Sequence, residues 1–259
     1  KTESPLQNVM FSKGGFFMLY FCMGVLGAII GSFINVVSMR LGKGEDFIYG
    51  RSCCPHCRHT LRAVDLIPLV SFLCLKGKCR YCKKRISIRY FLVEVLFSLI
   101  FILVASLKGP TEWIGYFFCC VCILIALMDL DSYEVDLRIL IILWGGGLIQ
   151  RVEMIESSFV SMTIGFMFYM IVYFWGKWIW KEEVFGMGDV YYLTALGAYF
   201  SVNQILYIGL LSFVIGGGVA LIWLFFARKA VLRAKIPFTP FMSISAVWTY
   251  LFSIQWILL

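Results

Sequence analysis

Two stretches of this sequence place acidic residues at the ends of long apolar runs, where they could transfer protons. Asp129-Leu130-Asp131 closes one apolar run, and Gly186-Met187-Gly188-Asp189-Val190 opens another. Only 15 of the 259 residues are Asp or Glu. Because an ionisable side chain at membrane depth is costly and usually functional, it is expected to have a partner. We therefore expect Asp129 and Asp189 to be partners.

A close pair of carboxyl groups has a specific chemistry. Both groups cannot ionise easily, so one keeps a proton while the other acts as a base. Such a pair deprotonates a water molecule and polarises a carbonyl oxygen, as in aspartic proteases. The sequence disfavours the other protease mechanisms. The only histidines, His56 and His59, lie in a cysteine-rich segment, which disfavours a Ser-His or Cys-His mechanism in the membrane, and no HExxH occurs that could hold a catalytic zinc.

The glycines beside the second aspartate allow two interpretations. Without side chains at Gly186 and Gly188, an extended substrate backbone could approach Asp189 closely. Alternatively, the motif is a plain turn before a helix, with Asp189 as the N-cap.

The composition indicates which class of protein must position these residues. The chain is 61% hydrophobic and 17% aromatic, with a mean hydropathy of +0.88, which exceeds the apolar content of about half that is typical of soluble domains. Its apolar stretches approach the roughly 20 residues that span a bilayer. We expect an all-α polytopic membrane protein with about eight transmembrane helices, at 15–39, 90–107, 113–128, 137–149, 159–180, 190–200, 205–227 and 236–259.

The basic residues predict the orientation of these helices. Twelve of the 23 Lys and Arg residues lie between Arg40 and Arg89, and such loops are cytoplasmic under the positive-inside rule. Both termini then face outward, and Asp129 and Asp189 lie at the same, cytoplasmic face. This topology accounts for the net charge of +8, so no nucleic-acid partner is required, although basic loops also favour anionic lipid headgroups.

A polar, basic segment divides the chain into three expected parts. Residues 1–40 form an N-terminal segment and the first helix, 41–89 a small cytoplasmic domain, and 90–259 the membrane domain that carries both aspartates.

The cytoplasmic segment contains two CxxC pairs, which are typical of a zinc site with four thiolate ligands, Cys54, Cys57, Cys79 and Cys82. Four thiolates complete a tetrahedral shell with no open position for catalysis. Because the segment has few apolar residues, the metal would supply folding free energy. Disulfides are the alternative, and a reducing cytoplasm disfavours them. Cys53, His56 or His59 could replace one ligand.

Two polar residues near the inner end of the first helix, Ser32 and Asn35, share one helix face. They suit either a contact between helices or a substrate groove.

Several motifs in the same order resemble the bacterial type IV prepilin peptidases (leader peptidase/N-methyltransferase), whose GxGD aspartyl-protease motif also occurs in presenilin-like and preflagellin peptidases. The matching segments are 31–41, 51–57, 65–68, 77–82, 86–94, 129–131, 186–190 with 197–198, and 236–241. Phe91 and Val135 stand where the family usually has proline.

The resemblance implies that Asp129 and Asp189 are the catalytic dyad, with Asp131 and Asp136 nearby but outside it. The implied substrates are type IV prepilin or pseudopilin precursors in the bacterial cytoplasmic (inner) membrane. Cleavage is expected after a glycine that ends a short basic leader, at the cytoplasmic face. We expect the leader to be recognised either by acidic side chains, such as Glu45, Asp46, Asp65 or Glu94, or by lipid headgroups.

The resemblance also implies methylation of the new N-terminus with S-adenosylmethionine. The sequence contains no glycine-rich cofactor loop after a strand, so we expect any such site in the cysteine-rich segment or at residues 31–35.

Two other classes of function fit some of these features. A zinc-containing membrane scaffold would use the aspartates only as helix caps, and a proton-coupled transporter would use them as relays.

Overall fold

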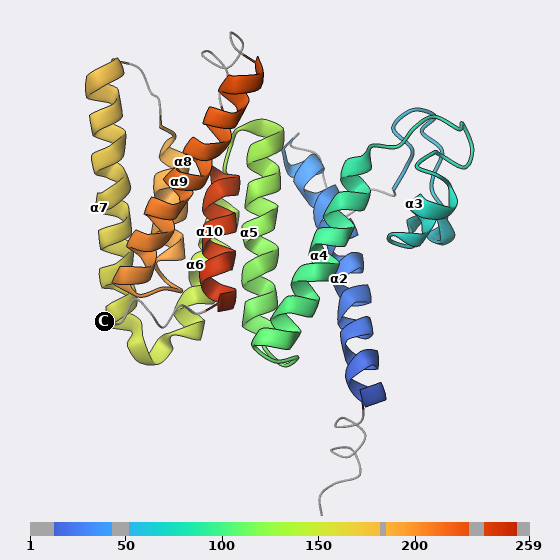
Figure 1. Cartoon of the computed structure of the whole chain (residues 1–259), viewed down its shortest axis with the longest axis horizontal. Helices are drawn as coiled ribbons and strands as arrows, with labels where there is room; N and C mark the ends of the chain where they lie inside the picture. The colour runs from blue at the N-terminus through green and yellow to red at the C-terminus, as the bar shows by residue number, and fades with distance from the viewer. Residues whose placement is uncertain (1–12, 43–51, 182–184, 228–235, 253–259) are drawn as a thin grey trace, which may run out of the picture. The chain divides into compact units, whose positions relative to one another are not determined.

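The computed structural model describes residues 13–42, 52–181, 185–227 and 236–252. It confirms the all-α fold: eight apolar helices correspond to the eight expected spans, and the described residues form isolated bridges but no strand. The helices, drawn in Figure 1, are α2 (Lys13–Leu41), α4 (Ile88–Leu107), α5 (Trp113–Ser132), α6 (Leu137–Gln150), α7 (Ile155–Trp180), α8 (Met187–Leu196), α9 (Val202–Ala227) and α10 (Thr239–Phe252). Shorter elements are η1 (Ala63–Leu66), α3 (Val70–Cys74) and η2 (Val152–Met154).

Helix length separates the eight into two groups. By length and composition, five helices of the described chain could cross a membrane, namely α2, α4, α5, α7 and α9. The described parts of α6, α8 and α10 have 14, 10 and 14 residues, fewer than the roughly 20 of a full span. α8 contacts α6, α7, α9 and α10, so neighbouring helices cover much of this short helix.

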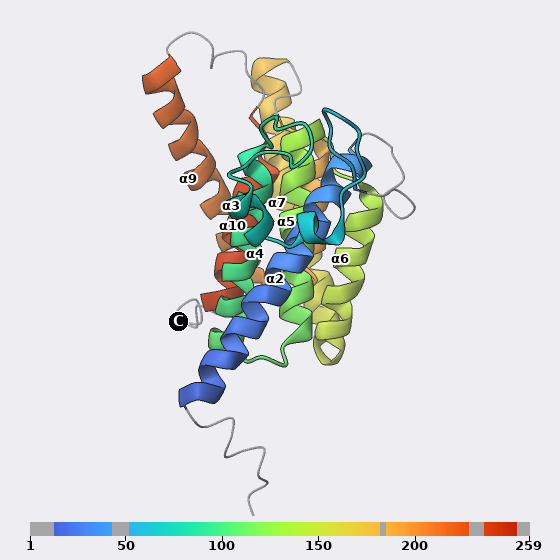
Figure 2. The ribbon, with the colours of Figure 1, turned by 90° about the vertical axis from the view of Figure 1, so that its right-hand side faces the viewer.

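The chain forms two compact units, Lys1–Tyr116 and Phe117–Leu259. In the first unit α2 and α4 pack closely, as both views show (Figures 1 and 2). Glycines on one face of α2 allow this approach: a Cβ at Gly27 would lie 2.5 Å from the carbonyl oxygen of Phe97, and one at Gly31 would lie 2.8 Å from its Cβ. Residues 90–107, expected in the catalytic domain, therefore pack against the first helix.

Polar side chains lie where the end of α2 meets the start of α4. Ser38 on α2 accepts a hydrogen bond from Arg89 on α4, with Nη2 and Oγ 3.2 Å apart. One turn earlier on α2, the Asn35 side chain is fully buried, and its amide oxygen and nitrogen lack a hydrogen-bond partner. Burial at this position places Asn35 within the packed interior of the protein.

The second unit is a bundle built around α8. Small residues bring its helices together: a Cβ at Gly197 would lie 2.7 Å from the Cα of Met162 on α7. Stacked rings join α5 to the rest, because Phe118 lies 4.6 Å from Tyr199 and 4.8 Å from Tyr250, measured between ring centroids. The two carboxylates of interest lie in this unit.

The close approach of α2 and α4 generates a stability prediction. We expect Gly27→Ala to lower the free energy of unfolding by about 1–3 kcal/mol, because the new methyl group would overlap the Phe97 backbone, which cannot rotate away. Thermal unfolding of the purified protein in detergent measures the effect. Gly217→Ala is the matched control, since a Cβ there meets nothing within 4 Å. Equal unfolding temperatures for the two variants would contradict this account.

Candidate functional site

Asp129 lies in the last turn of α5, and only 7% of its surface is exposed. Its Oδ2 accepts a hydrogen bond from the backbone N–H of Thr239, at 3.1 Å. Thr239 is the first residue of α10, where backbone N–H groups have no partner within the helix. The positive end of a helix dipole also stabilises a carboxylate. The start of α10 thus supplies the hydrogen-bond donor and the positive end of a helix dipole, both of which stabilise a buried carboxylate at Asp129.

Asp189 lies in the first turn of α8, which begins at Met187 after Gly186 as the N-cap residue. The alternative with Asp189 itself as N-cap is therefore wrong. Its Oδ1 accepts a hydrogen bond from the hydroxyl of Thr239 at 3.2 Å. The two carboxyl groups are also close enough to interact electrostatically. The structure thus brings Asp129 and Asp189 together, although 60 positions separate them in the chain.

Thr239 connects the two aspartates, and sequence reasoning missed it. It is 1% exposed and donates to one aspartate through its backbone and to the other through its side chain. The segment Ile236-Pro237-Phe238-Thr239-Pro240-Phe241 carried part of the family resemblance. A hydroxyl between two prolines at a helix start was the available signal.

A second polar link lies one turn further along the same helices. Ser243 follows Thr239 by four residues on α10, and its hydroxyl donates to the backbone oxygen of Cys122 on α5, at 2.9 Å. The Tyr192 hydroxyl on α8 lies 2.8 Å from the Ser243 oxygen. Because Ser243 has already given its proton, Tyr192 is the donor. This buried link holds α5, α8 and α10 in register.

Aromatic rings flank the same region. Phe238 precedes Thr239, and its ring lies 5.4 Å from that of Phe185, which precedes Gly186, and 4.9 Å from that of Phe213 on α9. Tyr169 on α7 completes the group at 5.2 Å from Phe185. These four rings, which we name the aromatic cluster, join the segments before Thr239 and Asp189 to α7 and α9.

The two glycines of the motif have different surroundings. A Cβ at Gly188 would meet Val135 at 3.2 Å, so the loop after Asp129 occupies the space that Gly188 leaves. Gly186 is exposed, and a Cβ there would lie 3.2 Å from Oδ2 of Asp189. Only Gly186 thus leaves open space beside the carboxylate.

The other nearby aspartates have separate surroundings. Asp136 is the N-cap of α6: its Oδ1 accepts from the backbone N–H of Arg138 at 2.8 Å, and its Oδ2 lies 2.6 Å from the Arg138 guanidinium. The hydrogen bond from the Arg138 side chain holds the pKa of Asp136 below its usual value. Asp131 is exposed at the end of α5. Neither contributes to the contact between Asp129 and Asp189.

The cysteine-rich segment forms two similar turns. The N–H of Cys54 donates to the oxygen of His59 at 3.0 Å, and the N–H of Cys79 donates to Lys84 at 2.9 Å. In each turn the residue after the second cysteine has a positive φ, 54° at Arg58 and 59° at Lys83. This conformation is uncommon for residues other than glycine, and its repetition shows that both CxxC pairs adopt the same geometry.

The four sulfurs of these turns lie within 4.8 Å of one another and could hold a metal ion, from Cys54, Cys57, Cys79 and Cys82. Cys54 and Cys82 Sγ are 3.8 Å apart, which matches the edge of about 3.8 Å that a tetrahedron with 2.3 Å Zn–S bonds requires. All four are free thiols, so the disulfide alternative is not what the structure forms. The His59 ring instead stacks on Tyr81, 3.7 Å between centroids.

The thiols influence one another strongly. Burial raises the pKa of Cys54, but hydrogen bonds from the backbone N–H groups of Cys57 and His56 outweigh it and lower that pKa to about 7. For Cys57, a backbone hydrogen bond from His59 lowers the pKa, while burial and the sulfurs of Cys54 and Cys82 raise it to about 11. Several thiolates this close therefore need a cation to ionise together.

Two carboxylates expected to bind the leader instead hold the cysteine-rich segment. Asp65, with its side chain 3% exposed, pairs with Arg80 at 2.5 Å and also accepts from Tyr81, both between Cys79 and Cys82. Glu94 is 7% exposed, and its Oε2 accepts from the backbone N–H of Leu69 at 2.7 Å. Leu69 has a φ of 61°, so Glu94 stabilises an uncommon backbone conformation. Glu45 and Asp46 lie outside the described residues.

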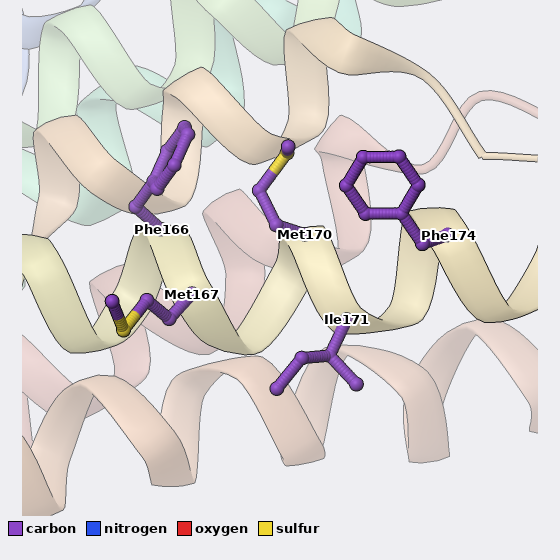
Figure 3. A pocket seen from close by; sticks show the side chains of 5 residues that line it. All are labelled: Phe166, Met167, Met170, Ile171 and Phe174. Carbon is purple, nitrogen blue, oxygen red and sulfur yellow. The ribbon is translucent and has the colours of Figure 1, made fainter.

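A shallow hollow of about 430 Å³ on α7 is lined only by apolar side chains (Figure 3), those of Phe166, Met167, Met170, Ile171 and Phe174. Its lining offers no group for proton transfer or metal binding, and it suits an apolar surrounding such as lipid.

Comparison with known families gives two matches. Residues 25–107 match the Bacterial Peptidase A24 N-terminal domain, and residues 116–221 match the Type IV leader peptidase family. The search found no match among solved structures.

Similar curated proteins cover most of the chain. A prepilin leader peptidase/N-methyltransferase of Aeromonas hydrophila is 33% identical over 260 residues, with 88% of this chain and 89% of the relative covered. The protein of that name from Myxococcus xanthus is 31% identical, covering 82% and 65%. A type 4 prepilin-like proteins leader peptide-processing enzyme of Escherichia coli O78:H11 is 31% identical, covering 86% and 90%.

The four-sulfur cluster predicts one tightly bound zinc ion per chain. We expect Cys79→Ser to lose that metal and to make the 52–87 segment sensitive to protease, because a structural zinc supplies folding free energy. Metal analysis and limited proteolysis measure both effects. Cys74→Ser, which changes an exposed cysteine outside the cluster, is the control. Full zinc content in Cys79→Ser would contradict the prediction.

Proposed function

The chain belongs to the type IV leader peptidase family, and we propose that it is an aspartyl endopeptidase that removes the leader peptide from prepilin-like precursors. Family membership makes it a peptidase enzyme, and its five long apolar helices indicate a multi-pass membrane protein. The observation that supports an aspartyl mechanism is the hydrogen bonding of one residue, Thr239, to both Asp129 and Asp189.

The proposed chemistry uses the two carboxyl groups in turn. One, ionised, takes a proton from a water molecule while the water oxygen attacks the scissile carbonyl carbon. The other, protonated, gives its proton to the carbonyl oxygen. The tetrahedral intermediate then collapses: its hydroxyl returns a proton to the carboxyl group that had donated one, the C–N bond breaks, and the amine leaves with the proton that came from water. No metal is needed for these steps, because one group accepts a proton while the other donates one.

We propose that the substrate backbone reaches this pair at Gly186. Gly186 is exposed and its missing side chain faces Asp189, whereas Val135 fills the corresponding space at Gly188. Gly188 would then support the loop rather than contact the precursor. Glu94, buried against Leu69, would act on the precursor only indirectly, by keeping the cysteine-rich segment folded.

The proposed site of cleavage is the cytoplasmic face of the inner membrane. Asp129 ends α5 and Asp189 begins α8, so both lie at one level of the second unit. The concentration of basic residues between Arg40 and Arg89 supports a cytoplasmic position for that segment. A precursor whose apolar helix lies in the bilayer would present its leader junction at this boundary.

Zinc is the metal that we propose for the cysteine cluster. The four sulfurs that would hold it leave no open position for catalysis, so its proposed role is to stabilise the segment.

We further propose that the enzyme methylates the new N-terminus with S-adenosylmethionine, since the relatives carry N-methyltransferase in their names. Asn35, whose buried amide lacks a partner, supports residues 31–35 as a place to test.

The experiment that tests the proposed function compares precursor cleavage by the wild type and two variants. We expect Asp129→Asn and Asp189→Asn each to lower the cleavage rate at least about 100-fold, because each loses one proton-transfer group. Mass spectrometry of the product of a precursor with a basic leader reports cleavage and any added methyl group together. Asp131→Asn, at an exposed position two residues from Asp129, is the matched control.

Undiminished cleavage by both dyad variants would overturn the proposal and favour a scaffold. Uptake driven by a pH gradient, without any peptide product, would instead indicate a transporter.

A further inference from the structure

Thr239 differs from the surrounding residues because it donates to both members of the proposed dyad. Its backbone N–H meets Oδ2 of Asp129 at 3.1 Å, and its hydroxyl meets Oδ1 of Asp189 at 3.2 Å. The side chain is 1% exposed, so water does not compete for these bonds. A single residue thus contacts both carboxyl groups: its hydroxyl interacts with both, and only Asp129 also faces the backbone N–H.

The two donors have different capacities. A backbone N–H can only donate, so Oδ2 of Asp129 always faces a donor, which favours an ionised carboxylate there. The start of α10 adds its dipole to the same effect. A hydroxyl can donate or accept. It therefore donates a hydrogen bond to an ionised Asp189 and can equally accept a hydrogen bond from a neutral one.

We infer that Thr239 is a positioning residue that assigns the two roles, with Asp129 as the general base and Asp189 as the general acid. This inference rests on the proposed function. Asp129 keeps its charge beside a fixed donor and takes the proton from water. Asp189 holds the shared proton, gives it to the carbonyl oxygen, and is stabilised as it ionises because the Thr239 hydroxyl then donates to it.

The surroundings of Thr239 explain why its hydroxyl stays in place. Ser243, four residues later on the same face of α10, forms hydrogen bonds with the Tyr192 hydroxyl and with the backbone oxygen of Cys122. The preceding residue, Phe238, packs in the aromatic cluster. These contacts do not involve the Thr239 hydroxyl, so a valine of similar shape leaves them intact.

Other ionisable groups near Asp189 are few. Within the described residues, those with an electrostatic effect on it are Asp129 on α5 and Tyr169 on α7. The Tyr169 hydroxyl is hydrogen-bonded to Ser212 and to the Gly209 oxygen on α9, and these hydrogen bonds do not involve Thr239. A change in the pH profile of a Thr239 variant is thus attributable to the dyad.

The test compares cleavage kinetics of Thr239→Val, Thr239→Ser and the wild type, with one precursor over a range of pH. We expect Thr239→Val to lower kcat about 10- to 100-fold, the effect of losing a hydrogen bond to a charged group, with KM unchanged because Thr239 does not touch the precursor. The basic limb of the profile should move to higher pH, since an Asp189 without its donor holds its proton more tightly. Thr239→Ser should restore both properties.

Thr249→Val is the matched control. It also removes a buried hydroxyl from α10, but one that bonds only within its own helix, to Ser245. We expect it to behave like the wild type. Thermal unfolding of each variant shows whether the fold is retained.

Three outcomes would overturn the inference: an unchanged kcat and profile in Thr239→Val, a shift of the acidic limb alone, or a failure of Thr239→Ser to restore activity. Each leaves the proposed function standing as long as Asp129→Asn and Asp189→Asn remain inactive. Cleavage by those two variants would instead overturn the proposed function itself.

Discussion

Two carboxyl groups packed among apolar helices lose part of the hydration that stabilises their charge, so the protein must provide donors in place of water. Here the donors come from the start of a helix. Thr239 begins α10 with a backbone N–H aimed at Asp129 and a hydroxyl aimed at Asp189. The arrangement of the second unit follows from this requirement, because α5 must end, and α8 and α10 must begin, at the same level.

That requirement accounts for the short helices of the second unit. α8 has 10 residues, and Asp189 lies in its first turn. Its contacts with α6, α7, α9 and α10 surround it with protein, which satisfies the condition for irregular backbone at membrane depth. In the second unit, shorter helices thus take the place of full spans. Their polar ends lie where they can contact the aspartates.

Local patterns in the sequence predicted much of the fold and part of the site. Runs of apolar residues predicted all eight helices, and the CxxC spacing predicted which four cysteines gather. Contacts between distant positions were not predictable, because the sequence around a hydroxyl in an apolar helix does not show which distant residue it contacts. Thr239 and Ser243 were therefore missed. Charge alone also says nothing of burial, so Glu94 was expected at a binding surface although it lies inside, bonded to Leu69.

The contact between Val135 and Gly188 changes the interpretation of the two glycines beside Asp189. The sequence predicted the same role for both glycines of the motif, namely to leave space beside a carboxylate. In the structure, the loop that follows Asp129 fills the space at Gly188, with Val135 at 3.2 Å from a Cβ position there. This contact joins the segments of the two aspartates independently of Thr239. The segments that carry the two aspartates are thus joined at two places, and the exposed Gly186 lies outside the contact with Val135.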